Sequence, residues 1–392
     1  MNQIDNPSAP LTGIQVLDFT NMLSGPYCTR LLADLGARVI KVESPHGDHN
    51  RTRRPVRDGH SSFFGHLNCG KQSVVMDLKS AAGREAATAL AARVDVVVEN
   101  WRPGVADRLG IGYTSVGASN PRVVYCSISG FGQKGPNAQR PAYAPIIHAA
   151  SGYDLAQVRY QGGGRPANTA TFTADVLGGM SAFAAIQSAL FHRERCGRGQ
   201  YIDVAMVDAM LNVLISECQE AQAPSGDRVR VYRPLKTRDG FVVVAPTSQK
   251  NFEQLTMVLK RPEWLKDPRL ITSAVREKNW TEFMDLIEGW TSERSSIDVE
   301  VQLLAGGVPC TRYLTVEEAL AEPQLRERGT MTRITDPAGS YLVPGLPFVM
   351  PGLFTAPRPG VPGLGEHSAA VLGEMLGYSA AQARNCSGAA DH

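Results

Sequence analysis

One carboxylate stands apart in the middle of the chain. Asp175 opens a stretch that carries no other charge until His192 and Arg193, and Gly178 and Gly179 follow it closely. At the start of a helix, unpaired backbone N–H groups keep a carboxylate ionised, and an ionised carboxylate can act as a nucleophile or a base. The two glycines would leave room for a bulky substrate. The alternative is an ordinary helix-terminal acid that interacts only with the helix dipole.

A cluster of arginines follows the end of an expected strand. Its members, within residues 51–57, are Arg51, Arg53, Arg54 and Arg57. Guanidinium groups match the geometry of phosphate oxygens, so the segment could clamp a polyphosphate ligand. A solvated basic loop explains the same residues equally well, and their spacing leaves both interpretations open.

Several familiar chemical motifs are absent from the sequence. No GxxxxGKS/T occurs and no GxGxxG follows the first expected strand, which disfavours an ordinary ATP or NAD site. The missing GxSxG weakens a serine hydrolase interpretation. The eight histidines form no HExxH or similar ligand spacing, so no metal site is expected.

The composition is that of an ordinary globular protein. The chain has 392 residues, which is enough for one large domain or for two domains with cores. Its formal net charge of only +2 predicts neither a nucleic-acid partner nor binding to an anionic membrane. It shows no uninterrupted apolar run long enough for a membrane span, and its first residues lack the features of a signal peptide. The seven scattered cysteines predict reduced thiols in the cytoplasm rather than a disulfide framework.

Short β-branched runs alternate with helical patterns in the first half of the chain. Strands are expected at 13–20, 38–44, 72–78, 95–100, 122–130 and 200–206, and helices at 24–37, 80–94, 105–120 and 175–195. This alternation is typical of an α/β protein with a parallel, doubly wound sheet.

The composition of the sequence changes after about residue 222. Residues 222–310 carry more aromatic and charged side chains and predict a small mixed domain. From Gly307 onward the chain is rich in proline, which favours a path over a surface rather than a separate core. A final helix is expected near 368–377. We therefore expect residues 1–221 to form most of a large domain, and residues 311–392 to return to it and complete it.

Several motifs together resemble those of the family III CoA-transferases. The opening of that family, which includes formyl-CoA:oxalate and carnitine CoA-transferases, is similar to PLTGIQVLDFTNMLSGPYCTRLLADLGARVIKVESPHGD. Further similar segments follow in order: LNCGKQSVVMDLKS, DVVVENWRPGVADRLG, NPRVVYCSISGFGQKGP, ALFHRERCGRGQYIDVAMVDAML and PGLGEHSAAVLGEMLGYS. The resemblance covers nearly the whole chain and is weakest between residues 222 and 310.

The resemblance implies a fold and an assembly. Family members have a Rossmann-like large domain built from both chain ends, with a small α+β domain inserted between them. Two such chains form an interlocked homodimer. The active site of each subunit then lies between its large domain and the small domain of the other subunit.

The resemblance also implies a mechanism. Asp175 occupies the position of the family's catalytic aspartate, in a D-x-x-x-G context ahead of a long helix. In the family, this carboxylate attacks an acyl-CoA and passes through a mixed anhydride to an aspartyl-CoA thioester, from which a second acid takes CoA. Water must be kept from the anhydride. Coenzyme A is then a substrate, the other partners are small carboxylic acids, and no permanently bound cofactor is expected.

Some positions resemble those that contact CoA in the family. They are Asn21, Met22, Met76, Lys79, Asn100, Trp101, Arg108 and Tyr143. Ser44 stands where formyl-CoA transferase has an arginine soon after its second strand. The missing charge would then come from Arg51, Arg53 or Arg54.

Two other functions are compatible with the sequence. α-Methylacyl-CoA racemases share the fold and use a histidine–aspartate pair to remove a proton beside the thioester. Their histidine falls near Tyr143 here, and His148 lies four or five residues later, where a simple helix residue is the plainer interpretation. A non-catalytic CoA-binding module is the third candidate, and an intact Asp175 argues against it.

The sequence narrows the exchanged acids only in part. Formyl-CoA transferases carry a loop of four glycines that is missing from the middle of this chain, which disfavours formate and oxalate. The sequence as a whole is more similar to family members that use succinyl-CoA with itaconate, mesaconate, citramalate or hydroxymethylglutarate. The second carboxylate of such an acid would need a cation near Asp175. The candidates are Lys134, Arg140, Arg165 and Arg312.

Overall fold

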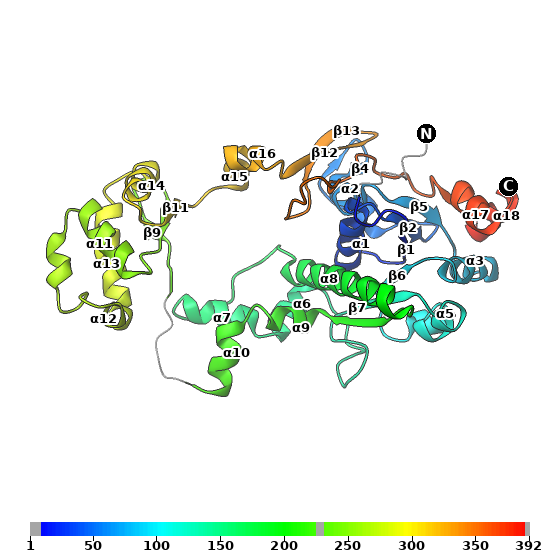
Figure 1. Cartoon of the computed structure of the whole chain (residues 1–392), viewed down its shortest axis with the longest axis horizontal. Helices are drawn as coiled ribbons and strands as arrows, with labels where there is room; N and C mark the ends of the chain where they lie inside the picture. The colour runs from blue at the N-terminus through cyan, green and yellow to red at the C-terminus, as the bar shows by residue number, and fades with distance from the viewer. Residues whose placement is uncertain (1–8, 225–230, 389–392) are drawn as a thin grey trace. The chain divides into compact units, whose positions relative to one another are not determined.

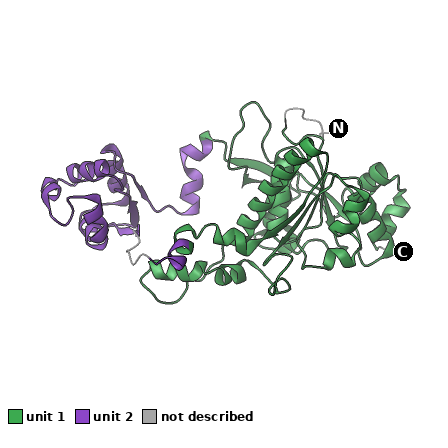
Figure 2. Cartoon of the chain, turned by 60° about the horizontal axis from the view of Figure 1, so that its bottom comes forward, with its two compact units in different colours: residues 1–218, 327–392 green, residues 219–326 purple. Residues whose placement is uncertain are grey.

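The computed structural model describes residues 9–224 and 231–388 (Figure 1). The chain divides into two compact units, one formed by residues 1–218 and 327–392 and the other by residues 219–326 (Figure 2). Helix α10 (Ile215–Gln222) contains the first crossing between them. The first unit therefore combines segments from both ends of the chain.

A parallel sheet forms the centre of the first unit. Among the described residues it has six strands, in the order β5-β2-β1-β6-β7-β8. They are β1 (Gln15–Asp18), β2 (Arg38–Glu43), β5 (Gln72–Val75), β6 (Val96–Glu99), β7 (Val124–Ser129) and β8 (Tyr201–Ala205). Neighbouring strands pair in parallel throughout, which confirms the predicted α/β class.

The order of the strands locates a crevice. Counted along the chain, the strands follow the doubly wound Rossmann order, and the direction of winding reverses between β1 and β6. Ligands of open α/β sheets bind outside the carboxyl ends of the strands at such a reversal. The topology therefore predicts a ligand site beside the loops that follow Asp18 and Glu99.

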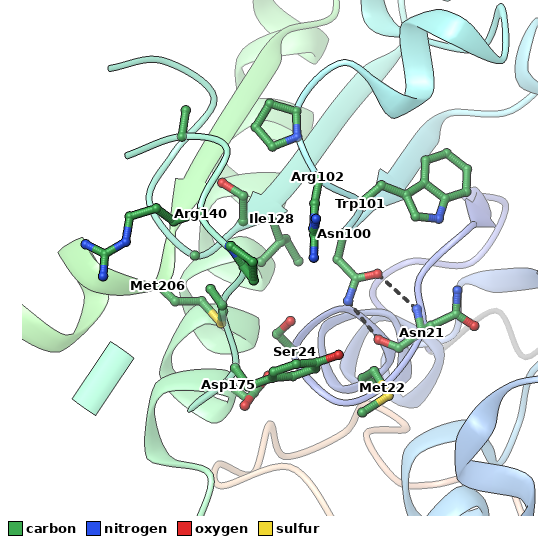
Figure 3. A pocket seen from close by; sticks show the side chains of 17 residues that line it. Asn21, Met22, Ser24, Asn100, Trp101, Arg102, Ile128, Arg140, Asp175 and Met206 are labelled. Atoms are coloured by element: carbon green, nitrogen blue, oxygen red, sulfur yellow. Dashed lines mark hydrogen bonds between the residues drawn. The ribbon is translucent and has the colours of Figure 1, made fainter. Parts of the chain in front are cut away.

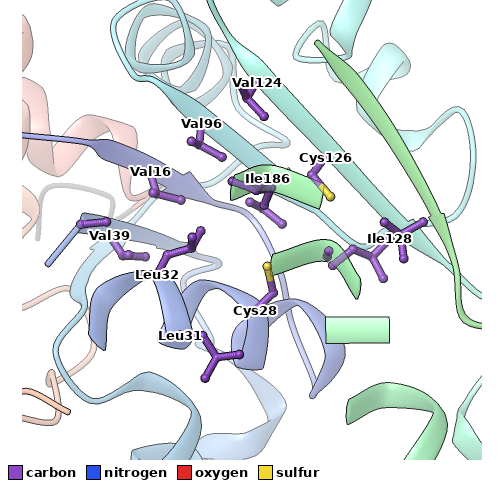
Figure 4. Close-up of a cluster of buried hydrophobic side chains, with 14 of the residues drawn as sticks. Val16, Cys28, Leu31, Leu32, Val39, Val96, Val124, Cys126, Ile128 and Ile186 are labelled. Atoms are coloured by element: carbon purple, nitrogen blue, oxygen red, sulfur yellow. The ribbon is translucent and has the colours of Figure 1, made fainter. Parts of the chain in front are cut away.

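Helices cover both faces of this sheet. Successive residues of a strand point to opposite faces, and apolar side chains on each face pack against helices. In β1, Val16 belongs to the buried cluster that contains α1 and α8, and Leu17 to the one that contains α3 and α17. Figure 4 shows the first cluster, in which Leu32 of α1, Ile186 of α8 and Val96 of β6 share one core. The C-terminal segment therefore completes the core of the first unit.

The helices of the first unit agree with the predicted ones in most places. They are α1 (Ser24–Asp34), α2 (Ser62–Asn68), α3 (Ala81–Ala91), α4 (Val105–Arg108), α5 (Tyr113–Ser119), α6 (Ala144–Ala150), α7 (Tyr153–Tyr160), α8 (Thr173–Cys196), α9 (Met206–Leu211), α17 (Ser368–Leu376) and α18 (Ala380–Cys386), with a 3-10 turn at η1 (His49–Thr52). Residues 105–120, expected to be largely helical, form two helices rather than one. The backbone turns at Gly110, whose φ of 76° suits glycine, and this turn separates α4 from α5.

Helix α8 carries the candidate nucleophile and runs for 24 residues. By length and hydropathy it could cross a membrane. However, its Ala174, Ala182 and Ile186 are buried in the core of the first unit, and the helix lies along α1 and the strands β7 and β8 (Figure 1). Packing against the sheet therefore accounts for its apolar character.

The second unit has its own small core. Its antiparallel sheet contains β9 (Leu235–Lys236), β10 (Phe241–Val244) and β11 (Cys310–Arg312). Its helices are α11 (Gln249–Val258), α12 (Ser273–Lys278), α13 (Trp280–Thr291), α14 (Ser296–Ala305), α15 (Val316–Ala321) and α16 (Pro323–Glu327), with a 3-10 turn at η2 (Pro262–Lys266). The boundary expected after residue 310 divides β11, which pairs with β10. The compact unit extends to residue 326 instead.

The proline-rich return was expected to run over a surface, and part of it forms a hairpin instead. Strands β12 (Met331–Asp336) and β13 (Gly339–Pro344) pair in antiparallel fashion. Ile334 and Val343 bury their side chains together with Cys69. A second small hairpin, β3 (Val56–Arg57) with β4 (His60–Ser61), meets the first through an ion pair of Arg57 with Asp336 at 2.9 Å.

Buried charges hold the loop that follows β1. The side chains of Lys71 and Asp18 are fully buried, and Nζ donates to Oδ2 at 3.0 Å. Asp18 also accepts hydrogen bonds from Thr29 Oγ1 (2.6 Å) and from the backbone N–H (2.9 Å) and hydroxyl (2.5 Å) of Thr20. Lys41 donates to the carbonyl of Thr20 at 2.8 Å. Thr20, in the loop that follows β1, is therefore fixed at its N–H, hydroxyl and carbonyl groups.

The same network continues beneath β2. Lys41 forms a buried ion pair with Asp48 at 2.9 Å, and the backbone N–H of Asp48 donates to Glu43 at 3.0 Å. Arg51 completes it with a bidentate ion pair to Glu43, at 2.7 and 2.8 Å. Burying charges is costly unless each has a partner, and here each charge has one.

Protonation of Asp18 follows from this pairing. Burial alone would raise the pKa of its carboxyl, but Lys71, Lys41 and the hydroxyl donors outweigh burial and lower the pKa to about 2. Burial lowers the pKa of Lys71 to about 8 although Asp18 opposes that change, so the ammonium still carries its charge near pH 7. The pair is therefore ionic under ordinary conditions.

Replacing Lys71 should reveal how much free energy it costs to bury the charge of Asp18 without a partner. The substitution Lys71→Met leaves the Asp18 carboxylate buried without its cation, and we expect it to lower the free energy of unfolding by about 3–5 kcal/mol. Urea denaturation followed by circular dichroism measures the change. The matched control is Arg122→Gln, which removes an exposed ion pair with Glu194 and should change stability by less than about 1 kcal/mol. Equal effects of the two substitutions would contradict a structural role for the buried pair.

Candidate active site

A pocket opens at the carboxyl ends of β1 and β6, in the crevice that the strand order predicts (Figure 3). Its volume is about 220 Å³. The loops after β1, β6 and β7 line it, together with the beginnings of α6, α8 and α9. These segments lie far apart in the sequence and meet only because the sheet is wound in two directions from β1 and β6.

Two asparagines join the strand ends at the floor of the pocket. The backbone N–H of Asn21 donates to Asn100 Oδ1 at 2.9 Å, and Asn100 Nδ2 donates to the carbonyl of Asn21 at 2.7 Å (Figure 3). An asparagine side chain offers one amide acceptor and donors in the geometry of a peptide group. Asn100 therefore pairs with the backbone as a neighbouring strand would, and it fixes the β1 loop against β6.

Met22 follows in a left-handed backbone conformation, with φ of 67°. A side chain that is not glycine adopts this region at a cost, and such residues gather at functional sites. Its carbonyl accepts a hydrogen bond from Asn50 Nδ2. The strained turn brings the chain directly into the start of α1 at Ser24.

Asp175 lies in the first turn of α8, half-buried in the wall of the same pocket. Its carboxylate accepts hydrogen bonds from the backbone N–H groups of Ser24 and Ala144. Ser24 is the first residue of α1, and Ala144 is the first residue of α6. Amide groups at these positions have no partner within their own helices. Two other helix N-termini therefore point at one carboxylate at the start of a third helix.

Burial and hydrogen bonding have opposite effects on the pKa of Asp175. Burial raises the pKa of its carboxyl to about 6, although the N–H donors of Ser24 and Ala144 and the positive charge of Arg53 oppose the rise. The group is therefore mostly ionised at pH 7 and largely stripped of water. A partly desolvated anion of this kind is suited to attack an electrophilic carbonyl carbon.

The small residues after Asp175 serve helix packing, which corrects the expectation that they make room for substrate. A methyl group at Gly179 would lie 2.6 Å from the carbonyl oxygen of Ser24, and one at Gly178 would lie 2.9 Å from Met206 Cγ. Both contacts are far closer than van der Waals distance. Gly179 thus allows α8 to approach α1 closely enough for the N–H of Ser24 to reach Asp175.

His148 helps to position the second donor, the backbone N–H of Ala144. It lies in α6 with 1% of its surface exposed, and its Nε2 accepts a hydrogen bond from the backbone N–H of Ala174 at 3.1 Å. Burial lowers the pKa of the ring, which agrees with a neutral imidazole that uses Nε2 as an acceptor. His148 therefore ties α6, which carries Ala144, to the residue that precedes Asp175.

The structure brings most of the residues singled out in the sequence into this pocket. Asn21, Met22, Asn100, Trp101, Tyr143 and Asp175 all line it. Tyr143 is 63% exposed, so its ring is accessible to a ligand. Of the cations considered for a second carboxylate, Arg140 lines the pocket. Arg312 belongs to the second unit and forms ion pairs there with Glu300 and Glu318.

Met76 does not reach the pocket. Its side chain has no exposed surface and belongs to the core beneath α3 and α17, so a side-chain contact with CoA is wrong. Lys79 and Arg108 are exposed and follow β5 and β6. They therefore lie along the same carboxyl edge of the sheet as the pocket, outside its lining.

The arginine cluster separates into residues with different roles. The guanidinium of Arg51 is held by Glu43 and also donates to the carbonyl of Pro362 at 3.1 Å. The ion pair neutralises its charge and all three nitrogens already donate within the protein, so a phosphate clamp at Arg51 stays a prediction that this geometry does not support. Arg54 is exposed to solvent. Arg53 faces Asp175 closely enough to affect its ionisation.

Sequence reasoning missed the backbone donors of Asp175. Leu23 is the N-cap of α1, and Ser24 offers its backbone N–H as the first helical residue. The contribution of Ala144 carries no signal in its side chain. Within residues 9–224 and 231–388, no three His, Cys, Asp or Glu side chains gather as ligands of a metal ion.

The profile of CoA-transferase family III matches residues 11–368. This chain belongs to CoA-transferase family III. It is thus an enzyme that transfers coenzyme A between acids, and its natural substrates are CoA thioesters and carboxylates. Both the family and the enzyme class predicted from the sequence are confirmed.

Curated bacterial relatives are similar over almost their whole length. The acetyl-CoA:oxalate CoA-transferase of Acetobacter aceti is 36% identical, over 94% of this chain and 96% of its own. The succinate–glutarate CoA-transferase of Agrobacterium fabrum is 32% identical, over 96% and 98%. A formyl-CoA:oxalate CoA-transferase of Escherichia coli is also 32% identical, over 95% and 97%.

Solved structures share the fold. A CaiB/BaiF family protein of Brucella suis superposes with a TM-score of 0.78 at 34% identity, covering 94% of this chain and all of its own. The Mycobacterium tuberculosis protein Rv3272 superposes with a TM-score of 0.83 at 27% identity, covering 92% of this chain and 98% of its own.

The raised pKa of Asp175 gives a pH dependence. Only an ionised carboxylate can attack a thioester, so a nucleophilic Asp175 should make kcat/KM for an acyl-CoA fall about tenfold per pH unit below a pKa of about 6. A solvent-exposed aspartate would place the same limb about two units lower. Steady-state rates with a thioester whose acyl group carries no free carboxyl measure the limb without titrating the substrate. A rate that stays constant between pH 7 and pH 5 would contradict the burial of this carboxylate.

Gly179→Ala should damage both stability and activity. The added methyl group collides with the Ser24 carbonyl, so we expect a loss of about 1–3 kcal/mol in unfolding free energy and a lower kcat as the N–H of Ser24 moves away. Gly289→Ala in α13 is the control, because a methyl group there meets nothing within 4 Å and should stabilise slightly. Thermal unfolding and the transfer assay measure both variants. If Gly179→Ala behaves like Gly289→Ala, the close approach of α1 and α8 is irrelevant.

Proposed function

We propose that Asp175 is the covalent nucleophile of this CoA-transferase. The observation that carries the proposal is the half-buried carboxylate with two backbone N–H donors, placed at the ligand crevice of the sheet. The pairing of a desolvated anion with donors that keep it ionised near neutral pH suits nucleophilic catalysis. The position of Asp175 within the resemblance to the family supports the same role.

The first half of the reaction loads the enzyme. A carboxylate oxygen of Asp175 attacks the thioester carbon of the donor, a C–O bond forms, and the C–S bond breaks to release CoA as a thiolate. The thiolate then attacks the side-chain carbonyl carbon of Asp175. A new C–S bond forms, the anhydride C–O bond breaks, and the donor acid leaves as a carboxylate with an oxygen from Asp175.

The second half repeats these steps with the acceptor acid. Its carboxylate attacks the aspartyl thioester, CoA leaves, and the thiolate attacks the acceptor carbonyl to regenerate the carboxylate of Asp175. No step needs a proton from the enzyme. The N–H groups of Ser24 and Ala144 would face the side-chain carbonyl oxygen while negative charge builds on it, which lowers the barrier to each attack.

We propose succinyl-CoA as a donor and a short dicarboxylic acid such as itaconate, mesaconate or citramalate as an acceptor. The names of the three curated relatives each include at least one dicarboxylic acid, namely oxalate, glutarate or succinate, and two of them also name acetyl-CoA or formyl-CoA. The missing glycine loop predicts that formate and oxalate are poor substrates, and this stays a prediction. The arginine beside Asp175 supports an acid with a second negative charge.

Coenzyme A would lie along the carboxyl edge of the sheet. Asn21 and Met22 from the β1 loop, and Asn100 and Trp101 from the β6 loop, would contact the end that bears the thiol. Lys79 would lie near its phosphates, because it follows an outer strand of the same edge. Arg54 and Arg108 remain candidates for the same role because both are exposed.

We also propose that two chains form the interlocked homodimer implied by the resemblance, and that it functions in the cytoplasm. Helix α8 leaves the apolar side chains of Met180 and Phe191 exposed, at 38% and 68%. Such exposure on a core helix supports burial against a second chain. Sedimentation would report the mass of a dimer, and a monomer in solution would overturn the assembly.

The racemase alternative receives no support from the site. A base must reach the carbon beside the thioester, but His148 is buried and its Nε2 already accepts the N–H of Ala174. Tyr143 stands where that family places its histidine, and a phenol ordinarily loses its proton only near pH 10. The geometry thus favours CoA transfer over proton removal.

Replacement of the nucleophile tests the proposal. Asp175→Ala should lower transfer by roughly ten-thousandfold or more while the protein stays folded. None of the other described residues that line the pocket carries a carboxylate that could form the thioester. Glu194→Ala, at the far exposed end of the same helix, should retain full activity. The assay uses mass spectrometry in heavy water, with succinyl-CoA and a mixture of itaconate, mesaconate, citramalate, malate and hydroxymethylglutarate.

Three results are distinguishable in that assay. A new acyl-CoA without deuterium beside the thioester identifies transfer and names the acceptor. A parallel tube with a 2-methylacyl-CoA detects a racemase, because deuterium would enter it without any new thioester. Wild-type rates in the Asp175→Ala variant would overturn the covalent mechanism.

A further inference from the structure

Arg53 is a cation held beside Asp175 by two aromatic rings. The guanidinium carbon lies 4.3 Å from the ring centre of Phe63 and 4.7 Å from that of Phe172. The two rings also meet each other edge to face, with their centres 6.3 Å apart. Each cation–ring contact is attractive, so the side chain is held in place without any carboxylate.

One of these rings fixes Arg53 relative to the nucleophile. Phe172 immediately precedes α8, and Asp175 belongs to the first turn of that helix. Burial raises the pKa of Asp175, and Arg53 is among the groups that oppose the rise. The guanidinium therefore lies close enough to the carboxylate for its positive charge to favour the ionised form.

The donors of Arg53 are not used by the protein. In the part of the chain that the structure describes, no side chain or carbonyl accepts a hydrogen bond from its guanidinium, and it forms no ion pair. The neighbouring arginines differ sharply, because Arg51 is taken up by Glu43 and Arg57 by Asp336. A guanidinium has five N–H donors, and those of Arg53 remain available to a ligand.

We propose that Arg53 binds the carboxylate of the substrate acid that does not react, and thereby selects dicarboxylic over monocarboxylic acids. The edge of a guanidinium offers two parallel N–H groups, which match the two oxygens of a carboxylate. The inference rests on the proposed role of Asp175. It adds a binding residue that sets the chemical class of the acid.

The arrangement explains why the cation is held by rings. A protein carboxylate in contact with Arg53 would compete with the substrate for the same donors. Aromatic faces hold the guanidinium through its flat surface and leave its edge free. Arg53 thus combines a fixed position with an unfilled capacity for hydrogen bonds, which is what recognition of a small anion requires.

A matched pair of acids tests the proposal directly. Succinate and butyrate differ only in that one terminal carboxylate is replaced by a methyl group. We expect Arg53→Gln to lower kcat/KM for succinate by about tenfold to a hundredfold, the value of a hydrogen-bonded charge, and to leave kcat/KM for butyrate within a few-fold of wild type. Arg53→Lys keeps the positive charge but lacks the two parallel N–H groups. Its kcat/KM for succinate should therefore lie between the values of wild type and Arg53→Gln.

Arg195→Gln provides the control. Arg195 also lies over an aromatic ring, that of Phe191, but at the opposite end of α8. Its removal changes the net charge by the same amount and should leave the ratio of succinate to butyrate unchanged. Phe63→Leu, which removes one supporting ring, should reduce the ratio of succinate to butyrate less than Arg53→Gln does. Circular dichroism of all four variants checks that they fold.

Three outcomes would overturn the proposal. If Arg53→Gln lowers kcat/KM equally for both acids and raises KM for the acyl-CoA, Arg53 contacts a phosphate of CoA instead. If both acids are affected equally and the acidic limb of the pH profile moves to higher pH, Arg53 serves only to ionise Asp175. If the ratio does not change at all, the residue has no part in selecting the acid.

The wild-type measurements keep this inference separate from the proposed function. Failure of the wild-type enzyme to move CoA to any acid would overturn the function itself. Preference of the wild-type enzyme for butyrate would overturn the dicarboxylate as substrate class, and the proposal for Arg53 with it. Wild-type preference for succinate that persists in Arg53→Gln overturns only the assignment of Arg53.

Discussion

The hydrogen bonds from the backbone N–H groups of Ser24 and Ala144 to Asp175 are the interaction on which the site depends. Without them, a carboxylate buried in this wall would take up a proton near neutral pH and lose its reactivity. Both donors are first residues of helices, so their positions are set by whole elements rather than by mobile side chains. The fold therefore surrounds the proposed nucleophile with donors whose positions are set by two helices.

Much of the first unit can be understood as support for those two donors. The buried pair of Lys71 with Asp18 and the bond from Lys41 to Thr20 fix the loop that leads into Ser24. Asn100 holds the same loop against β6. On the other side, His148 joins α6 to the start of α8. Charges and amides far from any substrate thus determine where two backbone N–H groups point.

The sequence predicted the parts of this account that depend on local pattern. The alternation of strands and helices predicted the parallel sheet, and the isolated charge of Asp175 made it a candidate nucleophile. The glycines after it were misinterpreted, because close packing of helices and space for a substrate require the same small residues. The roles of the backbone N–H groups were invisible, since any residue supplies one.

The arginine cluster shows where local pattern stops being informative. Arg51 and Arg53 are two residues apart and chemically identical, yet Glu43 neutralises one and two phenylalanines hold the other. Phe172 comes from a distant part of the chain, so no spacing in the sequence could pair it with Arg53. Similarly, the hairpin of β12 and β13 forms in a segment whose prolines favoured a loop, because Ile334 and Val343 find a buried place beside Cys69.

The covalent role of Asp175 can be tested by following oxygen atoms. In the proposed reaction, an oxygen of the acceptor carboxylate becomes an oxygen of Asp175 in each turnover. The wild-type enzyme would therefore be incubated with an acyl-CoA and an acceptor acid whose carboxylates carry heavy oxygen, then digested and examined by mass spectrometry. The account predicts that the peptide containing Asp175 gains heavy oxygen while other acidic peptides do not. Complete turnover without heavy oxygen in that peptide would mean that the two acids react with each other directly, and would contradict the account.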